Sequence, residues 1–323
     1  MIFPVLNATL SVFLLIVAGG FLRWVGCLRK EADGSLMSLC INVLYPCLIF
    51  DKISQTDILA HWETMWAAPL AGYLSVLLTL LMANVFTWLP RKVTGLRSAE
   101  ECRTFACATS LYNYGYLPIP ILLLLYPNDP EIMSMLFVFV LGVELAVWTC
   151  AVPCLAGGFH RGWWKNMLTV PFITILVSAG LNILGILPWI PSTIRQTIQW
   201  VGLGQISLPL LIIGAIIYDQ LLESRELRRW ETLPVVGWTL FFRSVFFPFV
   251  MILAALGLSS YPLLQKILII QAAMPSAMMI VMFTRIFGGS PVTAVQAVLS
   301  TNFFTPITTV FWITLGMWLL FPA

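Results

Sequence analysis

Apolar residues dominate this chain in long blocks, and short polar stretches separate one block from the next. A helix needs roughly 20 apolar residues to cross the hydrocarbon core of a bilayer. Ten blocks approach or exceed that length, with expected bounds at 3–24, 35–52, 64–89, 104–126, 132–155, 168–187, 195–221, 232–257, 263–286 and 292–321. The pattern therefore predicts an all-α integral membrane protein of ten transmembrane helices joined by short loops.

The fourth block is interrupted near its middle, in the stretch TSLYNYGYLPIPILLLLYPN at 109–128. Pro118 and Pro120 cannot donate backbone hydrogen bonds, and their rings clash with the preceding helical turn. A broken helix leaves N–H and C=O groups that hydrocarbon cannot satisfy, so the break must be buried in protein or line a wet cavity. The ninth block is interrupted in a similar way at Gln271-Ala-Ala-Met-Pro275-Ser276. Broken helices of this kind are typical of the substrate sites of transporters.

Blocks in the two halves of the chain resemble each other in order. The second and seventh each place an amide side chain four residues before a proline, Asn42 before Pro46 and Gln205 before Pro209. The first and sixth share the order of their glycine and leucine residues, and the fourth and ninth share the interruption. Ordered pairs of this kind indicate an internal repeat.

Five helices in each half is an odd number, which forces the second half to enter the membrane from the opposite side. We therefore expect two inverted five-helix repeats, at 1–156 and 168–323, joined by a cytoplasmic connector at 157–167. The fourth and ninth helices would then cross at their breaks, near the middle of the membrane.

Composition agrees with a membrane protein. Hydrophobic residues make up 60% of the chain and charged residues 10%, and the mean hydropathy is +0.94. These values lie outside the usual range of soluble domains. The net charge of +3 is too small to indicate a nucleic-acid partner.

The basic residues predict the orientation of the chain. The loops expected in the cytoplasm hold Arg23, Arg29, Lys30, Arg91, Lys92, Arg97, Arg103, Arg161, Lys165, Arg225, Arg228, Arg229 and Arg285. The opposite loops hold Lys52, Arg195 and Lys266. Because Lys and Arg concentrate on the cytoplasmic side, we expect a multi-pass protein of the cell (inner) membrane with both termini outside the cytoplasm.

The two breaks supply the candidate substrate site. The start of a helix presents unpaired N–H groups and about half a positive charge, which can stabilise a carboxylate without a basic residue. We expect such starts at 118–121 and 275–278. The residues expected around them are Asn113, Pro118, Pro120, Gln271, Pro275 and Ser276. The amides of Asn113 and Gln271 either donate to a carboxylate or cover orphan carbonyls; the alternative is that the prolines only kink packed helices.

Asn42 and Gln205 are further candidates. Each lies about one turn before a proline. Each therefore either satisfies the carbonyl group that the proline frees or faces the substrate cavity.

Glu144 and Arg243 are ionisable residues inside the fifth and eighth blocks. Charges within the membrane are costly unless they are paired or hydrated, so a functional role is the first hypothesis. Desolvation favours the neutral form of a carboxyl group, so Glu144 could bind a proton and couple transport to the proton gradient. A static ion pair between the two residues and separate structural roles stay open as alternatives.

Several stretches, taken in order, resemble the auxin efflux carrier family. They are LNATLSVFLLIVAGGFLRWVGCL at the start, INVLYPCLIFDKIS in the second block, NYGYLPIPILLL at the first break and RSVFFP, from Arg243 to Pro248, in the eighth block. That family includes plant auxin carriers and short bacterial malate or malonate permeases. This chain resembles the bacterial form, because no large cytoplasmic domain separates its halves.

The resemblance implies a carrier for organic anions whose fourth and ninth helices cross at proline breaks beside the substrate. It also implies a homodimer of elevator type. In such a carrier the first, second, sixth and seventh helices form the scaffold, which would place Asn42 and Gln205 on the scaffold wall of the site.

Other classes of function lack their motifs. The histidines, His61 and His160, fall in loops on opposite faces, and HExxH and GxSxG motifs are absent, which argues against an enzyme. The seven cysteines show no CxxC spacing, and no GxxxxGK[ST] motif is present. We therefore expect no metal site, no cofactor and no use of ATP.

Together these features predict a secondary transporter that moves small organic anions by alternating access. The drive would be the membrane potential or protons. An inside-negative potential of 100 mV is worth about 2.3 kcal/mol per charge and pushes anions out, so export is the expected direction. The alternatives are an anion channel and a non-transporting receptor with a transporter fold.

Overall fold

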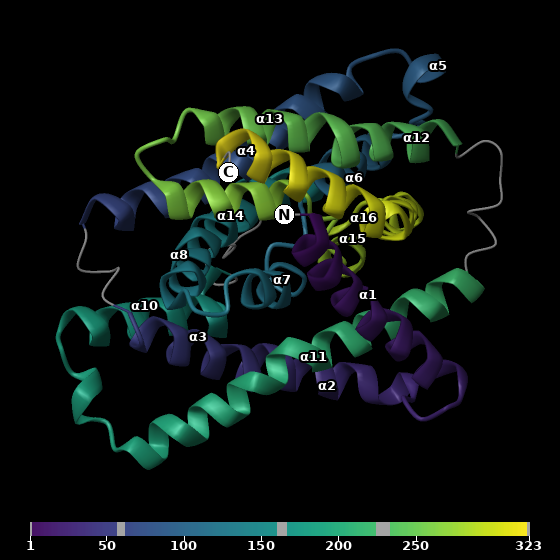
Figure 1. The fold of residues 1–323 in the computed structure, drawn as a ribbon. Helices are drawn as coiled ribbons and strands as arrows, with labels where there is room; N and C mark the ends of the chain where they lie inside the picture. Colours follow the sequence, from purple (N-terminus) through teal and green to yellow (C-terminus); the bar gives the residue numbers. More distant parts are fainter. Residues whose placement is uncertain (1, 57–61, 160–166, 224–232, 322–323) are drawn as a thin grey trace.

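The computed structural model of the protein describes residues 2–56, 62–159, 167–223 and 233–321. The first half of the chain contains α1 (Ile2–Trp24), α2 (Asp33–Leu39), α3 (Tyr45–Ser54), α4 (Trp62–Thr87), α5 (Arg91–Thr94), α6 (Ala99–Ser110), α7 (Pro118–Leu125), α8 (Pro130–Ala146) and α9 (Val152–Ala156). The second half contains α10 (Val170–Ile183), α11 (Ser192–Glu223), α12 (Leu233–Phe241), α13 (Phe247–Leu256), α14 (Pro262–Ala272), α15 (Met279–Phe287) and α16 (Pro291–Leu320), as Figure 1 shows. Most of the expected connector at 157–167, and both histidines, lie outside the described residues.

Seven helical stretches among the described residues are long and apolar enough to cross a membrane. Four are the single helices α1, α4, α11 and α16, and three are runs of joined helices, namely α2 to α3, α8 to α9 and α12 to α13. The protein is therefore an all-α, multi-pass membrane protein.

Among the described residues, seven helical stretches are long enough to span a membrane, whereas the sequence predicts ten spans. The fourth expected span is divided into α6 and α7, and the ninth into α14 and α15. The sixth is α10, which has only 14 residues. It ends in a glycine cap, because Gly185 adopts a φ of 66° and the Ile186 N–H bonds to the carbonyl oxygen of Leu181, which stops the helix.

The three runs of joined helices continue through a proline because each contains a wider, π-helical turn. A proline inside a helix lacks an N–H and collides with the turn before it, and a π turn gives the backbone an extra residue there. The turns and the prolines that follow them are Cys40–Leu44 before Pro46, Val147–Ala151 before Pro153 and Phe242–Phe246 before Pro248. The third turn contains Arg243, so its side chain projects from a locally widened helix.

Glycines let neighbouring helices approach closely. A Cβ atom at Gly142 of α8 would overlap the carbonyl group of Pro69 in α4, and one at Gly214 of α11 would overlap the carbonyl group of Ile16 in α1. Small residues at such contacts are the usual way in which transmembrane helices pack. In Figure 1, α11 crosses the lower side of the molecule with α2 and α3, away from α12 and α13 on the opposite side.

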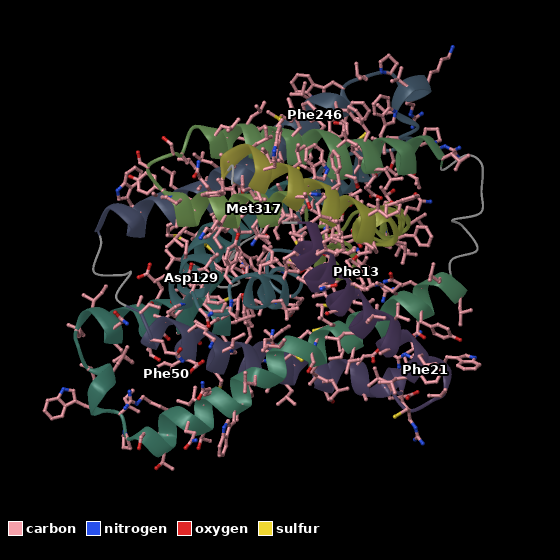
Figure 2. The ribbon with its side chains drawn as sticks, viewed as in Figure 1. Phe13, Phe21, Phe50, Asp129, Phe246 and Met317 are labelled. Carbon is pink, nitrogen blue, oxygen red and sulfur yellow. The ribbon has the colours of Figure 1, made fainter. Side chains whose placement is uncertain are left out.

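Apolar side chains cover the outside of the bundle as well as its interior. Phe21 of α1 is 55% exposed and points outward (Figure 2), as expected for a residue that faces lipid. Phe105 of α6 and Phe137 of α8 are fully buried in the main core. The main core therefore lies inside the bundle, while apolar side chains on the outside face the lipid.

Candidate functional site

The two interrupted helices meet at their breaks. Between α6 and α7 the chain is extended, and Tyr112 forms an antiparallel bridge with Ser276, which lies between α14 and α15. The N–H of Asn113 donates to the carbonyl oxygen of Pro275, and the N–H of Ala277 donates to that of Leu111, both at 2.8 Å. Two segments far apart in the sequence thus satisfy each other's backbone, as buried broken helices require.

The amide of Asn113 closes the start of the helix that follows it. Its Oδ1 accepts from the N–H of Tyr116 at 3.1 Å and, more weakly, from that of Leu117 at 3.4 Å. The next residue, Pro118, has no N–H to offer. Asn113 thus caps the turn that leads into α7, while the N–H of Ile119 in the first turn of α7 has no partner among the described residues. The Nδ2 of Asn113 has no partner in the described part of the chain either.

The amide of Gln271 ties the second break to the first. Its Nε2 donates to the carbonyl oxygen of Tyr114 at 3.1 Å, which covers an orphan carbonyl of the unwound segment. Its Oε1 is buried and finds no partner among the described residues. Gln271 therefore has one hydrogen-bond acceptor at the crossing that no described residue uses.

Side chains from α16 satisfy the second break. Thr301 accepts from the N–H of Ser276 at 3.2 Å, Asn302 donates to the carbonyl oxygen of Ser276 at 3.4 Å, and Thr309 donates to that of Ala273 at 3.0 Å. The sequence analysis missed these residues. Threonines at 301, 305 and 309 share one helix face because their spacing is four, and this pattern could have identified them.

Helix α15 begins later than predicted, and this leaves donors free. The expected start was 275–278, but Pro275 lies in the extended segment and the helix resumes at Met279. Ile280 and Val281 donate to the carbonyl groups of Ala277 and Met278. The N–H groups of Met278 and Met279 have no partner among the described residues, as expected at the first turn of a helix.

Arg243 reaches the crossing from the wide turn between α12 and α13. Its Nη2 donates to the carbonyl oxygen of Ala272, the last residue of α14, at 2.9 Å. Its guanidinium group lies 5.2 Å from the ring centroid of Tyr112, a cation–π distance. The side chain is 1% exposed, and its Nε and Nη1 have no partner in the part of the chain that the structure describes.

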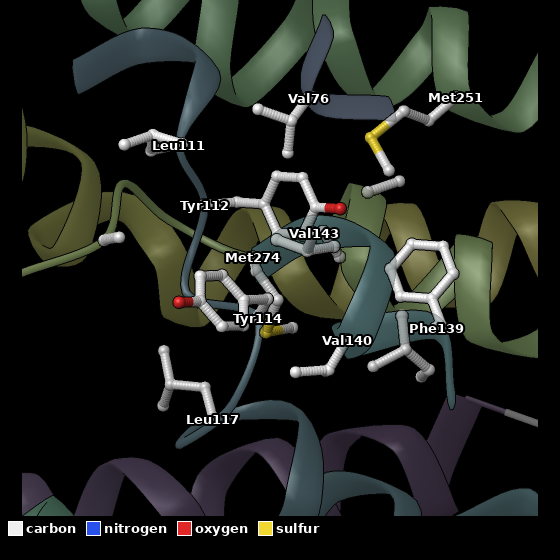
Figure 3. Packing of buried hydrophobic residues seen from close by; sticks show 14 of the residues in the cluster. Val76, Leu111, Tyr112, Tyr114, Leu117, Phe139, Val140, Val143, Met251 and Met274 are labelled. Carbon is white, nitrogen blue, oxygen red and sulfur yellow. The ribbon is translucent and has the colours of Figure 1, made fainter. Parts of the chain in front are cut away.

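Glu144 reaches the crossing from α8, on its other side. The hydroxyl of Tyr114 donates to its Oε1 at 2.8 Å, and Nε1 of Trp148 donates to its Oε2 at 3.2 Å. Figure 3 shows the rings of Tyr112 and Tyr114 in the packed interior, with hydroxyls that point in opposite directions. No ion pair joins Glu144 to Arg243 among the described residues, so the static pair considered above is not found.

Asn42 and Gln205 lie in different surroundings. Asn42 is exposed, and its amide donates to the hydroxyl of Ser38 at 3.0 Å. Gln205 is 1% exposed, and neither atom of its amide has a partner among the described residues. No hydrogen bond of either side chain to a carbonyl group beside its proline is found in the described part of the chain.

A tyrosine of α3 also faces the crossing and was missed from the sequence. The hydroxyl of Tyr45 would lie 3.5 Å from a Cβ atom at Gly115, and it has no partner among the described residues. Its ring packs on Phe137 at 5.9 Å, on the same face of α8 as Glu144, seven residues further along. Nothing in the local sequence of Tyr45 marks this placement, because it depends on how α3 packs against α8.

Comparison with known proteins supports a transport function. The family model described as "Membrane transport protein" matches residues 4–156 and 160–313, which is nearly the whole chain. A search among curated proteins gave no match. Members of this family are membrane transporters rather than enzymes. The chain belongs to the membrane transport protein family, whose members are auxin efflux carrier-like proteins.

Proposed function

We propose that the protein is a secondary carrier for small organic anions and that the anion binds where α15 begins. One observation carries this proposal, namely the free N–H groups of Met278 and Met279 beside two interrupted helices that cross. The hydroxyl of Ser276 lies in the same break, buried and without a partner among the described residues. Free donors at a helix start favour a carboxylate.

The packing of the helices supports two inverted five-helix repeats. If the first and second spans correspond to the sixth and seventh, the contact of α1 with α11 corresponds to that of α10 with α3. The contact of α4 with α6 likewise corresponds to that of α13 with α14. The family match is also split in two, between residues 156 and 160, within the expected connector at 157–167.

The burial of the crossing favours a carrier over an open channel. Tyr112, Gln271 and Ser276 are each 0% exposed, whereas a channel needs a continuous wet path. Alternating access would uncover the site on one side of the membrane at a time. A non-transporting receptor would bind the anion without moving it, and a flux measurement separates that function from a carrier.

We propose a cell-membrane location with both termini outside the cytoplasm, on the distribution of Lys and Arg described above. A homodimer is proposed on the resemblance to elevator-type carriers. Under the membrane potential alone, an anion carrier of this kind exports. A proton-coupled carrier would instead follow the combined gradients of anion and proton.

Counterflow in proteoliposomes tests the site directly. We expect saturable exchange of one of three radiolabelled probes, pyruvate, malonate or indole-3-acetate, and weaker binding in Met278→Pro. Met278 has a φ of −65°, which proline adopts without strain, so the substitution removes one free N–H. Losing a hydrogen bond to a charged group weakens binding about tenfold or more.

Met278→Ala is the matched control, because it shortens the same side chain and keeps the N–H. Equal exchange by the two variants would place the anion elsewhere. Conductance that does not saturate would identify a channel. Binding of a probe without flux would identify a receptor.

A further inference from the structure

Glu144 is a buried acid whose partners are neutral. It is 9% exposed, and its carboxyl group accepts one hydrogen bond from Tyr114 and one from Trp148. No Lys, Arg or His nitrogen lies within ion-pair distance of it among the described residues. A charge inside the membrane without a counter-charge is costly. The protonation state of Glu144 therefore changes the net charge of the whole site.

Both donors to Glu144 also touch α15. The hydroxyl of Tyr114 lies 3.6 Å from Sδ of Met279, at the start of that helix. The ring of Trp148 packs on Phe283, one turn further along, at 5.6 Å between centroids. The carboxyl group of Glu144 is therefore a close neighbour of the place where we propose that the anion binds.

Few other groups act on this carboxyl group. Three tyrosines face it, Tyr114 from the first break, Tyr45 from α3 and Tyr116 before α7. The helices packed on α8 bring no unpaired charge to it among the described residues. Helix α4 has no charged residue between 66 and 87, and α10 has none. On α3, Asp51 and Lys52 pair with each other, and Lys266 of α14 pairs with Asp129. The anion would thus be the strongest new influence on Glu144.

We propose that Glu144 binds a proton when the anion binds, so that the carrier moves one proton with each monocarboxylate. This inference rests on the proposed anion site. Two carboxylates that share one site cannot both stay ionised, because like charges at short range disfavour each other. By linkage, the anion then favours the proton on Glu144, and the proton favours the anion to the same degree.

The charges around the crossing balance under this scheme. With anion bound, Arg243 carries one positive charge, the anion one negative charge, and Glu144 is neutral. Without anion, Arg243 is positive and the Glu144 carboxylate negative. The net charge is the same in both states, so neither step moves uncompensated charge through the membrane, where it is expensive.

We assign Tyr45 as the acceptor for the proton of the acid. A carboxylic acid O–H requires an acceptor when it is buried, and the Tyr45 hydroxyl is buried and has no partner among the described residues. Because Tyr45 belongs to α3 and Tyr114 to the first break, the proton lies where the second span contacts the crossing. An electroneutral carrier of this kind exports when the combined gradients of anion and proton point outward, whatever the membrane potential.

Infrared difference spectroscopy of the purified protein tests the proton site without any anion. We expect the band of a protonated carboxyl group to appear on acidification and to be missing in Glu144→Gln. Glu131→Gln, an exposed residue on the same helix, should keep the band. A band that is absent in wild type, or that persists in Glu144→Gln, would overturn the assignment of the proton to Glu144.

Proteoliposomes that contain a pH-sensitive dye test the coupling. With the probe that gives the strongest counterflow, wild type should carry protons inward together with the anion and ignore an imposed potential. Glu144→Gln should keep exchanging anion for anion but slow net uptake about tenfold or more, because its empty form carries the uncompensated charge of Arg243. Net uptake by wild type that follows the potential without acidification would refute coupling. If no probe exchanges, the carrier proposal fails, and with it the coupling, while the infrared result still decides the proton site.

Discussion

The break between α6 and α7 is capped by a side chain of its own, Asn113, whereas the break between α14 and α15 is bound by side chains of α16 and its helix start has no side-chain cap among the described residues. In the first, Asn113 accepts from the N–H groups that precede α7. In the second, Thr301, Asn302 and Thr309 of α16 bind the unwound backbone, but none of them reaches the N–H groups of Met278 and Met279. Two breaks of similar sequence character thus differ in what they can offer a ligand.

This difference teaches that an interrupted helix is not by itself a binding site. What matters is whether a side chain already occupies the free donors, because a capped helix start has less to offer an anion. The two buried ionisable residues, Arg243 and Glu144, also lie at different helix ends. Arg243 contacts the end of α14, and Glu144 lies beside the start of α15.

Removing Arg243 is the variant with the largest expected effect on anion binding. Arg243→Met deletes a buried cation that has no acid partner in the described part of the chain, next to the open break. Losing a charged contact of this kind costs about tenfold to a hundredfold in affinity, so half-saturation in the counterflow assay should rise by that factor.

Arg285→Met is the control for this experiment, because Arg285 is exposed near the other end of α15. It should leave half-saturation unchanged. An equal loss in both variants would mean that the effect on the anion does not depend on where the positive charge lies. Unchanged binding in Arg243→Met would leave Arg243 with a purely structural role at the end of α14.

An intermediate effect is expected at Asn113, where two variants separate its role as a helix cap from its role in anion binding. Asn113→Asp keeps an acceptor for the N–H of Tyr116 and places negative charge at a helix start, which is favourable. The variant should bind the anion about tenfold more weakly, because the new charge repels it. Its unfolding temperature should also fall, because a charge buried inside the membrane is costly. Asn113→Ala removes the cap and should lose about 1 kcal/mol of stability.

Thermal unfolding in detergent and counterflow, measured on the same preparations, check both statements. If Asn113→Asp transports as well as wild type, the first break takes no part in binding, and of the two breaks only the second binds the anion. If Asn113→Ala unfolds at the wild-type temperature, Oδ1 of Asn113 is not acting as a cap.

The sequence predicts where helices break better than it predicts which break is open. Proline and glycine act locally, so Pro118 and Pro275 mark the interruptions without any knowledge of packing. The free N–H groups of Met278 and Met279 depend on the bridge between Tyr112 and Ser276, which joins distant segments. Glu144 and Arg243 can likewise be recognised from the sequence, because each is a charged residue within an apolar block. Their partners cannot be recognised, because they come from distant segments.

The smallest expected effect concerns two tyrosines at the first break that differ in one hydrogen bond. The hydroxyl of Tyr112 lies 2.6 Å from Oγ of Ser75, whereas that of Tyr45 has no partner among the described residues. Tyr112→Phe should lower the free energy of unfolding by about 1 kcal/mol, the usual net value of one such bond, and Tyr45→Phe should leave it almost unchanged. Thermal unfolding of the two variants in the same detergent measures the difference.

Tyr45→Phe should instead shift the infrared band of the Glu144 carboxyl group, since it removes the acceptor that we assign to its proton. A stability loss in Tyr45→Phe as large as that in Tyr112→Phe would show that the Tyr45 hydroxyl is already bonded within the protein, and Glu144 would then need another acceptor.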